Sequence, residues 1–455
     1  MAETTIAAIS TPQAAGGIGI VRISGPDALK IADNVFQASN GLLLSQSAGY
    51  RAYHGLVWDK GVAVDEAVCL VFRAPHSYTG EDTAEISCHG GLYILQRVLK
   101  AVLNAGAVPA EAGEFTKRAY LNGKMDLADA EAVMSLISAQ GEQAARAALT
   151  ALEGALSKKI HECAQSLIYA AAQMSAWVDY PDEDIEELSL ENLESRFLQV
   201  KATLGDLLSN FDTGRAVTQG VETVIVGRPN VGKSTLMNLL TGFERSIVTE
   251  YAGTTRDVVE ETVRLGELVL HLSDTAGMRD TDNPVESIGV ERALKKLKSA
   301  DLVLAVFDGS DSLTNEDRQL LKNCKEKLTI AVINKNDLPR ALDLEYINSI
   351  AADTVEISAV SGEGLDRLSK SVSRLLGTES FDPGAAMLAT ERQRACCERA
   401  LALIDEALTA INCGQTMDAI NVCTDSAIEA LLELTGEKAS EAVVNEVFSR
   451  FCVGK

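Results

Sequence analysis

The spacing of hydrophobic residues divides the chain into zones of different texture. In residues 1 to about 120, short apolar runs separated by glycine and proline predict strands at Ile18–Ile23, Glu66–Phe72 and Thr83–Cys88. Between residues 126 and about 211, apolar residues instead recur at helical spacing in stretches rich in Ala, Leu and Glu. The first half of the chain is therefore predicted to be an α+β module followed by helices.

The helical texture occurs twice along the chain. Proline is absent between Pro109 and Pro181, which favours long uninterrupted helices, and the acidic run 179–184 is predicted to be a loop between two of them. After Pro383 the helical texture returns, again without proline, and continues to residue 455. The simplest interpretation is one helical domain interrupted by an inserted domain. The alternative is two separate helical bundles.

The zone between these helical stretches alternates strand-like and helical segments. Its strand-like runs are Thr223–Val226, Leu268–Leu272, Leu302–Phe307, Thr329–Ile333 and Val355–Ile357. Such alternation predicts a mostly parallel sheet with helices on both faces. The predicted domains are therefore 1–120 (α+β), 121–217 (helical, first part), 218–379 (α/β) and 380–455 (helical, second part).

Residues 227–234 read Gly-Arg-Pro-Asn-Val-Gly-Lys-Ser between a predicted strand and a predicted helix, which is the setting of a phosphate-binding P-loop. The glycines let backbone N–H groups surround the phosphates, Lys233 can reach the β and γ oxygens, and Ser234 can coordinate Mg²⁺. The helix N-terminus adds its dipole. The predicted nucleotide contacts here are Asn230, Val231, Gly232, Lys233, Ser234 and Thr235.

Further nucleotide motifs follow the next strands in order. Asp274, at a strand end, can hold Mg²⁺ through water, and the N–H of Gly277 can meet the γ-phosphate. In Asn334-Lys335-Asn336-Asp337, the carboxylate of Asp337 can accept the paired N–H edge of guanine. The predicted contacts are Asp274, Thr275, Ala276, Gly277, Asn334, Lys335, Asp337, Ser358, Ala359 and Val360. The four motifs together predict a GTP-binding G domain.

A threonine-containing segment lies between the P-loop and Asp274. Such a switch must supply a second Mg²⁺ ligand that senses the γ-phosphate, and Thr255 is the best candidate. The alternative is a surface loop with incidental threonines. The predicted GTP contacts of this segment are Thr249, Glu250, Tyr251, Ala252, Gly253, Thr254 and Thr255.

The residue that orients the attacking water is not the usual one. Many small GTPases place a glutamine directly after the glycine of the Asp-x-x-Gly motif, but here that residue is Met278, which cannot polarise water. Two carboxylates just downstream, Asp280 and Glu286, are candidates for this task. Arg256 and Arg279 could supply positive charge, or they could be ordinary surface arginines.

Asn230 suggests another source of positive charge. A side-chain oxygen in the P-loop could help to hold a monovalent cation where other GTPases receive an arginine finger. The alternative is a plain turn residue.

Several longer signatures resemble the MnmE (TrmE) family of tRNA-modification GTPases, and the resemblance spans essentially the whole chain. Besides the G-domain motifs, these signatures are Gly-Ile-Gly-Ile-Val-Arg-Ile-Ser-Gly at 17–25, Tyr-Thr-Gly-Glu-Asp at 78–82, Gly-Glu-Phe-Thr at 113–116, Leu-Asn-Gly-Lys-Met-Asp-Leu at 121–127 and Phe-Cys-Val-Gly-Lys at 451–455. The implied fold is multidomain, with an N-terminal α+β folate-binding and dimerisation domain, an α-helical domain and an inserted P-loop α/β G domain.

The resemblance also implies site residues. K⁺ would be bound by the side chains of Asn230 and Thr254 and by the carbonyls of Thr249 and Tyr251, and Glu286 would position the attacking water. A tetrahydrofolate derivative, in its 5-formyl or 5,10-methylene form, would be bound by a set of charged residues. These are Arg22, Glu81, Lys124 and Lys455. Without the family they would be scattered surface charges. Cys452 matches a family cysteine, or is a thiol on a frayed tail.

By the same resemblance, the protein would be a homodimer that works with an FAD-dependent subunit, MnmG, in a heterotetramer-type complex. Together they would modify C5 of the wobble uridine of certain tRNAs, with an aminomethyl or carboxymethylaminomethyl type of group. A rival interpretation is a non-modifying GTP switch such as a ribosome-assembly GTPase. An enzyme that modifies tRNA unaided is disfavoured, because no Gly-x-Gly-x-x-Gly flavin motif opens a βαβ unit.

Composition refines this interpretation. The chain has 41 basic and 65 acidic residues, a net charge of −24, so it lacks the overall positive charge typical of a free RNA binder. A more basic partner is expected to supply much of the grip on tRNA. The nine cysteines form no Cys-x-x-Cys pair, and no window has a secretory or membrane-spanning pattern. A cytoplasmic protein with reduced thiols and no membrane partner is predicted.

Overall fold

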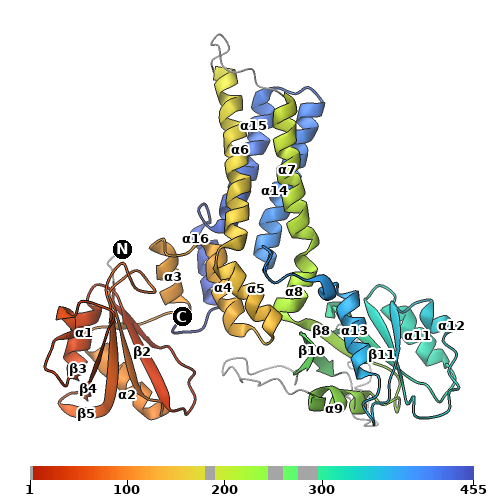
Figure 1. The fold of residues 1–455 in the computed structure, drawn as a ribbon, viewed down its shortest axis with the longest axis horizontal. Coiled ribbons are helices and arrows are strands. Elements are labelled where there is room, and N and C mark those ends of the chain that lie inside the picture. The colour runs from red at the N-terminus through yellow and green to blue at the C-terminus, as the bar shows by residue number, and fades with distance from the viewer. Residues whose placement is uncertain (1–3, 180–189, 244–259, 275–295) are drawn as a thin grey trace, which may run out of the picture. The chain divides into compact units, whose positions relative to one another are not determined.

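The computed structural model describes residues 4–179, 190–243, 260–274 and 296–455 (Figure 1). These residues form two compact units. The first unit comprises Met1–Met134, Ser157–Phe197 and Arg399–Lys455, and the second comprises Ser135–Leu156 and Leu198–Glu398. Helices α7 (Leu190–Ser209) and α14 (Glu391–Asn412) contribute residues to both units.

The N-terminal part of the first unit is an α+β domain, as predicted. Its elements are β1 (Ile6–Ile9), β2 (Ile18–Ser24), α1 (Ala28–Val35), β3 (Phe36–Ala38), the short 3₁₀ helix η1 (Leu44–Gln46), β4 (Arg51–Asp59), β5 (Val62–Phe72), β6 (Thr83–His89), α2 (Leu92–Asn104), β7 (Val108–Pro109) and α3 (Glu114–Leu121). The seven-stranded sheet has the order β3-β4-β5-β6-β2-β1-β7, and its pairings are antiparallel except for that of β1 with β7. The three strands predicted from the sequence are present as β2, β5 and β6.

The two faces of this sheet have different roles. Val21 and Ile23 of β2 are fully buried in the core formed with α1 and α2. Alternation along the strand places Arg22 on the opposite face, where its guanidinium lies 5.4 Å from the ring centres of both Tyr78 and Phe115. One face of the sheet therefore packs against α1 and α2, and the other carries a smaller buried cluster that includes Phe115, beside which Arg22 lies.

The last residues of the chain pack onto this domain. Ala112 and Val453 form an isolated antiparallel bridge, and the N–H of Gly113 donates to the carbonyl of Cys452 at 3.4 Å. Gly454 has φ +99°, and a Cβ added to it would lie 2.3 Å from the carbonyl oxygen of Ile9. Only glycine fits between the tail and β1.

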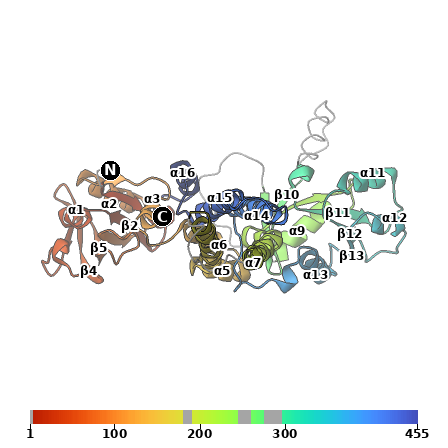
Figure 2. The same cartoon turned by 90° about the horizontal axis from the view of Figure 1, so that it is seen from above.

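The helices of the first unit come from both sides of the inserted part of the chain. They are α4 (Leu127–Ser138, which extends into the second unit), α6 (Ala155–Asp179), α15 (Met417–Thr435) and α16 (Glu441–Ser449), with parts of α7 and α14. The long helices lie side by side and are seen end-on in Figure 2. Asn421 of α15 donates to Ser175 of α6 at 3.3 Å, so segments far apart in sequence share one bundle.

Two expectations about these helices need qualification. The expected long helix exists as α6, with 25 residues, but the stretch before it is divided into α4 and α5 (Glu142–Leu152). Gly141 and Gly154 lie at the breaks, so glycine interrupts this proline-free stretch. Most of the predicted acidic loop at 179–184 lies outside the described residues.

Within the described residues, no helix combines the length and apolarity needed to cross a membrane.

The second unit contains the predicted α/β domain. Its further elements are α8 (Phe211–Gln219), β8 (Val221–Val226), α9 (Lys233–Phe243), β9 (Glu260–Leu265), β10 (Leu268–Asp274), β11 (Leu302–Asp308), α11 (Asn315–Cys324), β12 (Thr329–Asn334), α12 (Glu345–Asn348), β13 (Asp353–Glu356), α13 (Leu365–Leu375) and the 3₁₀ helix η2 (Thr378–Ser380). The sheet order is β13-β12-β11-β8-β10-β9, and only β9 is antiparallel to its neighbour. Buried clusters lie on both faces, which confirms a mostly parallel sheet between helices.

We expect Gly454→Ala to release the tail from β1. Left-handed backbone costs an alanine about 1–2 kcal/mol, and the clash with Ile9 adds to this, so hydrogen exchange at the Gly113 amide should speed up by roughly tenfold or more. The matched control is Gly414→Ala, because Gly414 has φ +65° but no atom within 4 Å of an added Cβ. Unchanged exchange at Gly113 in the Gly454 variant would show that the tail does not depend on this contact.

Candidate functional site

The P-loop joins β8 to α9 and is closely packed. Gly232 has φ +98°, and a Cβ added there would lie 2.1 Å from Nδ2 of Asn334, so the loop cannot accept a larger residue at this position. Asn230 also has a positive φ, +66°, which asparagine tolerates better than most residues. Val231 between them is buried. The backbone amides are therefore held in the curved arrangement that surrounds phosphates.

Lys233 begins α9 and bends back over the loop. Its ammonium donates to the carbonyls of Gly227 and Arg228, at 2.8 Å each. Ser234 and Thr235 follow in the first turn of the helix, and both are exposed. The positive end of the helix and the lysine thus lie at the same loop, as expected for a phosphate site.

Asn334 connects the P-loop to the base-recognition loops. It is buried at the end of β12, its Nδ2 donates to the carbonyl of Val231 at 2.8 Å, and its Oδ1 accepts from the N–H of Ala359 at 2.9 Å. Both halves of the side-chain amide are thereby used within the protein. The structure assigns Asn334 the role of a brace between loops, a finer role than the sequence motif indicates.

The residues predicted to recognise the base are arranged around the same strand ends. Asp337 is exposed, and its Oδ1 accepts a hydrogen bond from the hydroxyl of buried Ser358 at 2.7 Å, which orients the carboxylate. Ala359 is buried beside it, whereas Val360 is 85% exposed. Asp337, Ser358 and Ala359 therefore come together as predicted, and Val360 extends into solvent.

Lys335 is fixed by a partner that the sequence motifs do not include. Its ammonium lies 2.5 Å from Oδ2 of Asp308, at the end of β11. Burial alone would raise the pKa of Asp308, but hydrogen bonds from Lys335 and Ser310 outweigh it and hold that pKa below its ordinary value. The only sequence signal for Asp308 was its place directly after a buried strand.

Several predicted residues of the nucleotide site cannot be located. Asp274 ends β10, but its side chain is not described. The following predicted residues lie outside the described residues: Thr249, Glu250, Tyr251, Ala252, Gly253, Thr254, Thr255, Arg256, Thr275, Ala276, Gly277, Arg279 and Glu286. Met278 and Asp280 lie there too.

A second cluster of predicted residues lies in the first unit. The Nε of Arg22 donates to Oε1 of Glu85 at 2.8 Å, and both side chains are about one-sixth exposed, at 15% and 16%. One guanidinium nitrogen of Arg22 lies 3.5 Å from the carbonyl of Gly454. The two ends of the sequence therefore meet at Arg22, between the aromatic rings already described.

Lys455 and Cys452 belong to the same cluster. Burial and the positive charge of Arg22 lower the pKa of the Lys455 ammonium, and Glu85 only partly opposes them. The backbone carbonyl of Cys452 accepts from the N–H groups of Gly113 and Lys455, so its backbone is held in place rather than frayed. Among the described residues, no contact assigns a chemical role to the Cys452 thiol.

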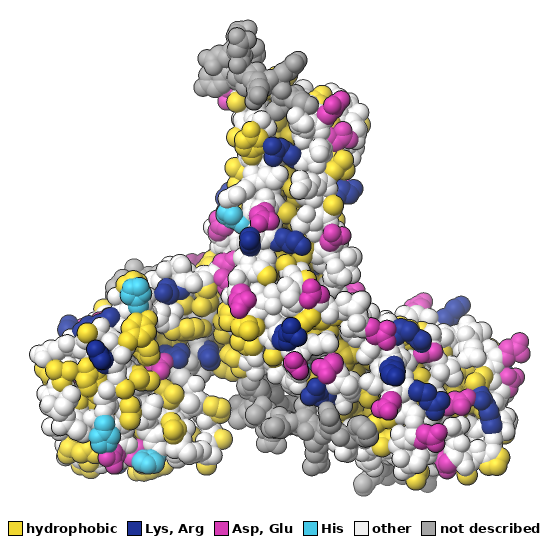
Figure 3. Space-filling model, in the orientation of Figure 1, with side chains coloured by type: hydrophobic (Ala, Val, Ile, Leu, Met, Phe, Trp, Pro, Cys, Tyr) yellow, Lys and Arg dark blue, Asp and Glu magenta, His cyan; other side chains and the backbone are white. Residues whose placement is uncertain are grey.

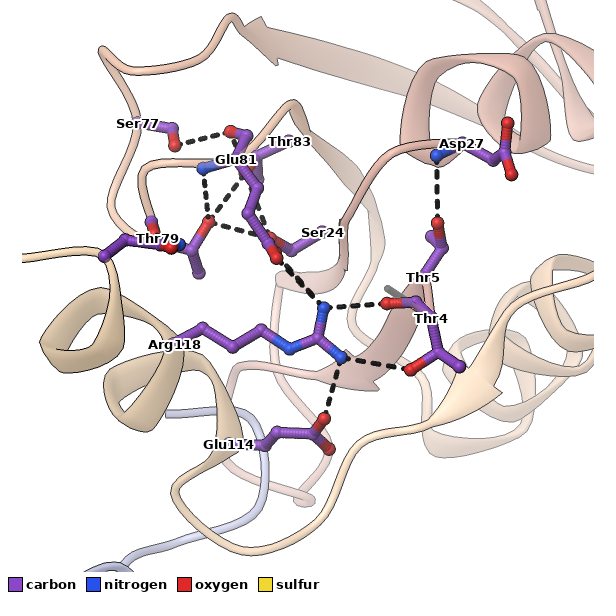
Figure 4. A network of polar contacts seen from close by, with 11 residues as sticks. Thr4, Thr5, Ser24, Asp27, Ser77, Thr79, Glu81, Thr83, Glu114 and Arg118 are labelled. Carbon is purple, nitrogen blue, oxygen red and sulfur yellow. Dashed lines mark hydrogen bonds and ion pairs between the residues drawn. The ribbon is translucent and has the colours of Figure 1, made fainter. Parts of the chain in front are cut away.

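Glu81 and Lys124 lie on the neighbouring loops (Figure 4 shows the surroundings of Glu81). The hydroxyl of Ser24 donates to Oε2 of Glu81 at 2.7 Å, and Ser24 is two residues from Arg22 on β2. Lys124 donates to the carbonyl of Pro75 at 3.0 Å. A Cβ added to Gly80 would lie 3.5 Å from Cγ of Lys124, so the lysine stem passes beside the turn that carries Glu81.

Sequence reasoning missed four residues around this cluster. Tyr78 and Phe115 lie inside the quoted family signatures, which was the available signal. Glu85 and Arg118 carried no signal of their own, because they are ordinary charged residues on a strand and a helix. The structure shows that both pair with predicted residues, Glu85 with Arg22 and Arg118 with Glu81.

The matches to known proteins span both the nucleotide site and the N-terminal cluster around Arg22. The family model for the MnmE helical domain matches residues 127–452, and the model for the GTP-binding protein TrmE N-terminus matches residues 5–124. The chain is similar to proteins named tRNA modification GTPase MnmE. That of Lactococcus lactis subsp. cremoris (strain SK11) is 42% identical over 99% of this chain and 98% of its own, and that of Geobacillus kaustophilus (strain HTA426) is 41% identical over 99% of each.

A solved G domain, that of the T. maritima FeoB iron transporter, is 27% identical over 34% of this chain and 98% of its own, with a TM-score of 0.26. The assignment rests on the family models and the full-length relatives instead. Their matches include the N-terminal cluster, the helical bundle and the nucleotide loops alike. By these matches, the chain belongs to the MnmE (TrmE) family of tRNA-modification GTPases.

Proposed function

We propose that this protein is a potassium-activated GTPase that acts in the cytoplasm with an FAD-dependent MnmG subunit to modify C5 of the wobble uridine of certain tRNAs. A tetrahydrofolate derivative, 5-formyl or 5,10-methylene, would supply the one-carbon unit. The observation that carries the proposal is the full-length likeness to relatives named tRNA modification GTPase MnmE, at 42% identity over 99% of the chain. GTP hydrolysis in tRNA modification is the activity common to the family.

GTP and Mg²⁺ would be bound at the P-loop. The backbone amides of residues 230–235 and the Lys233 ammonium would hold the phosphates, while Ser234 and Thr255 would bind Mg²⁺. Bound Mg²⁺ supplies positive charge to the phosphate oxygens. Gly232 supports this fit, because its positive φ and close contact with Asn334 exclude a side chain and let the backbone curve as phosphate-binding loops do.

A K⁺ ion would be held at the same loop by Asn230 together with Thr249, Tyr251 and Thr254. The Asn230 side chain is exposed and has no partner among the described residues, so its oxygen is available as a ligand. Bound K⁺ would supply the positive charge that an arginine finger supplies elsewhere. Glu286 would then orient the attacking water, the task that Met278 cannot perform.

The charges of the N-terminal cluster fit a folate. Arg22 and Lys455 are two neighbouring cations, and Glu85 is the carboxylate that acts on both of them among the described residues. A carboxylate of the folate glutamate tail would complete this balance. Glu81 would accept hydrogen bonds from the pterin edge, and Lys124 would lie beside it. The bound folate supplies the one-carbon unit.

Surface properties support partners for the protein. Hydrophobic side chains gather over the N-terminal domain on the face shown in Figure 3, and exposed apolar residues of this domain include Ile18, Val62 and Tyr93. Such a surface fits homodimerisation. Over the nucleotide-binding part, Lys and Arg are interspersed with Asp and Glu on the same face. Because this chain has a net charge of −24, most of the favourable contacts with tRNA phosphates would come from MnmG.

The rival function, a non-modifying GTP switch, shares only the G domain. It gives no reason for Arg22, Glu85 and Lys455 to meet in a polar cluster. Nucleoside mass spectrometry of tRNA from cells without the protein decides between the two. We expect loss of the C5-substituted wobble uridine and its recovery when the gene is restored. An unchanged nucleoside profile would leave the switch as the better interpretation.

We expect GTP hydrolysis to be faster in K⁺ than in Na⁺ at equal ionic strength, by roughly tenfold or more, because positive charge placed at a developing negative charge contributes factors of about 10². Phosphate release measured in the two salts tests this. Substituting Asn230→Ala should remove most of the difference. Equal turnover in both salts would exclude a K⁺ role.

We expect Glu286→Ala to retain GTP binding but to lose turnover by about 10²-fold, since a group that orients or accepts a proton from water typically contributes this much. Fluorescent-nucleotide binding and phosphate release measure the two effects separately. Asp280→Ala is the matched control, and its turnover should be close to that of the unsubstituted protein. If the two variants exchange behaviour, Asp280 activates the water.

A further inference from the structure

Arg118 of α3 is held rigidly by several partners (Figure 4). Its side chain is only 13% exposed. One guanidinium nitrogen donates to the carbonyl of Thr4 at 2.7 Å, and the other donates to Oε1 of Glu114 at 2.8 Å and to the Thr4 hydroxyl at 3.3 Å. A planar guanidinium tied at both ends has little freedom to rotate.

The same guanidinium grips the Glu81 carboxylate. The nitrogen that binds the Thr4 carbonyl lies 3.1 Å from Oε1 and 3.3 Å from Oε2 of Glu81. The hydroxyl of buried Ser24 donates to Oε2 at 2.7 Å from another side. Glu81 is thus held by side chains from a strand and a helix, and its carboxylate has one orientation.

The turn beneath Glu81 is fixed as well. The hydroxyl of Thr79, which is fully buried, accepts from the N–H of Glu81 at 3.2 Å and is hydrogen-bonded to the Ser24 hydroxyl at 2.7 Å. Asn122 donates to the Thr79 carbonyl at 2.7 Å. Backbone and side chain of Glu81 are therefore set by one connected network.

Orientation matters for the ligand proposed here. A pterin presents neighbouring N–H groups in one plane, and a carboxylate accepts them together only when it lies in that plane. A carboxylate has more acceptor positions than the Arg118 and Ser24 bonds occupy, so it can accept from a ligand while it remains gripped. A side chain ordered before binding loses less freedom on binding.

We propose that Arg118 is the positioning residue of the folate site, acting through Glu81 rather than touching the folate. The inference rests on the proposed folate role of Glu81 and extends it to a residue outside the predicted binding set. Two of the other predicted folate residues have different partners, since the contacts of Arg22 are with Glu85, Gly454 and the aromatic rings and that of Lys124 is with Pro75.

A purely structural role is the competing explanation. Through Thr4, Arg118 also ties the segment before β1 to α3, and its loss could disturb the domain without any specific effect on Glu81. The two explanations differ in whether the effects of Arg118 and Glu81 on the ligand are coupled. A double-mutant cycle measures this coupling.

The experiment is titration calorimetry of the full-length protein with 5-formyltetrahydrofolate. The variants are Arg118→Lys, Glu81→Gln and the double substitution, with Arg97→Lys as a control at another arginine of the same domain. We expect each single variant at the site to weaken binding by about tenfold or more, and the double variant to bind no more weakly than Glu81→Gln alone. The control should stay within about twofold, as distant surface substitutions generally do.

Measurements with a second ligand make the test insensitive to partial unfolding of the variants. The dissociation constant of the analogue without the 2-amino group, divided by that of 5-formyltetrahydrofolate, is independent of the fraction of folded protein, because that fraction scales both constants equally. We expect this ratio to be large in the unsubstituted protein and to fall towards one in Arg118→Lys. A ratio that Arg118→Lys leaves unchanged would overturn the positioning role.

The outcomes also separate this inference from the proposed function. No folate binding by the unsubstituted protein would remove the folate part of the function and this inference with it. Two other outcomes would leave the proposed function intact and overturn the role of Arg118. One is folate binding that is insensitive to Glu81→Gln. The other is that the affinity losses of the two single variants multiply in the double variant. The positioning role of Arg118 is supported if the affinity losses of the two single variants are coupled and the ratio of dissociation constants falls towards one in Arg118→Lys.

Discussion

The contact between the C-terminal tail and the N-terminal sheet is the constraint on which the rest of the first unit depends. The guanidinium of Arg22 and the carbonyl of Gly454 are separated by 432 positions in sequence and by 3.5 Å in space. Because the tail must return to β1, the helices that precede it must return as well, and α15 packs against α6 in one bundle. The G domain is consequently an insertion, since the chain leaves the bundle and comes back to it. The polar cluster exists only when this return is complete.

The nucleotide site shows a different solution to the problem of bringing distant residues together. Here the carboxyl ends of parallel strands meet at one edge of a sheet, so loops after β8, β11, β12 and β13 become neighbours without any long return of the chain. Asn334 uses both ends of its amide to fasten two of these loops, and Lys335 with Asp308 fastens a third. These contacts leave Asp337 and the first turn of α9 exposed.

How far the sequence could predict this structure depends on the range of the interaction concerned. The strands β2, β5, β6, β8 and β10–β13 follow from local hydrophobic patterns, and the P-loop and guanine motifs follow from short spacings with a known chemical purpose. Pairings such as Arg22 with Glu85 or Glu81 with Arg118 join separate elements, and nothing local distinguishes Glu85 or Arg118 from surface charges. The break between α4 and α5 was missed for a related reason, because absence of proline does not guarantee a continuous helix when glycine is present. The family resemblance names the residues expected to face a ligand, whereas Glu85 and Arg118, which pair with two of them, carry no family signal.

Lys335 and Lys455, one in each site, differ in the charged groups that surround them. Lys335 faces Asp308 directly, and its hydrogen bond helps to hold the pKa of Asp308 below its ordinary value. Lys455 faces another cation, and its pKa is lowered because burial and Arg22 disfavour the charged ammonium. An anion bound beside Lys455 would therefore stabilise its charged form, whereas Lys335 already faces a carboxylate. By linkage, an anionic ligand at Lys455 would raise its pKa back towards the ordinary value and would bind most tightly below the lowered pKa, where the ammonium is charged. This difference supports the proposed role of Lys455 as a group that binds an anionic ligand.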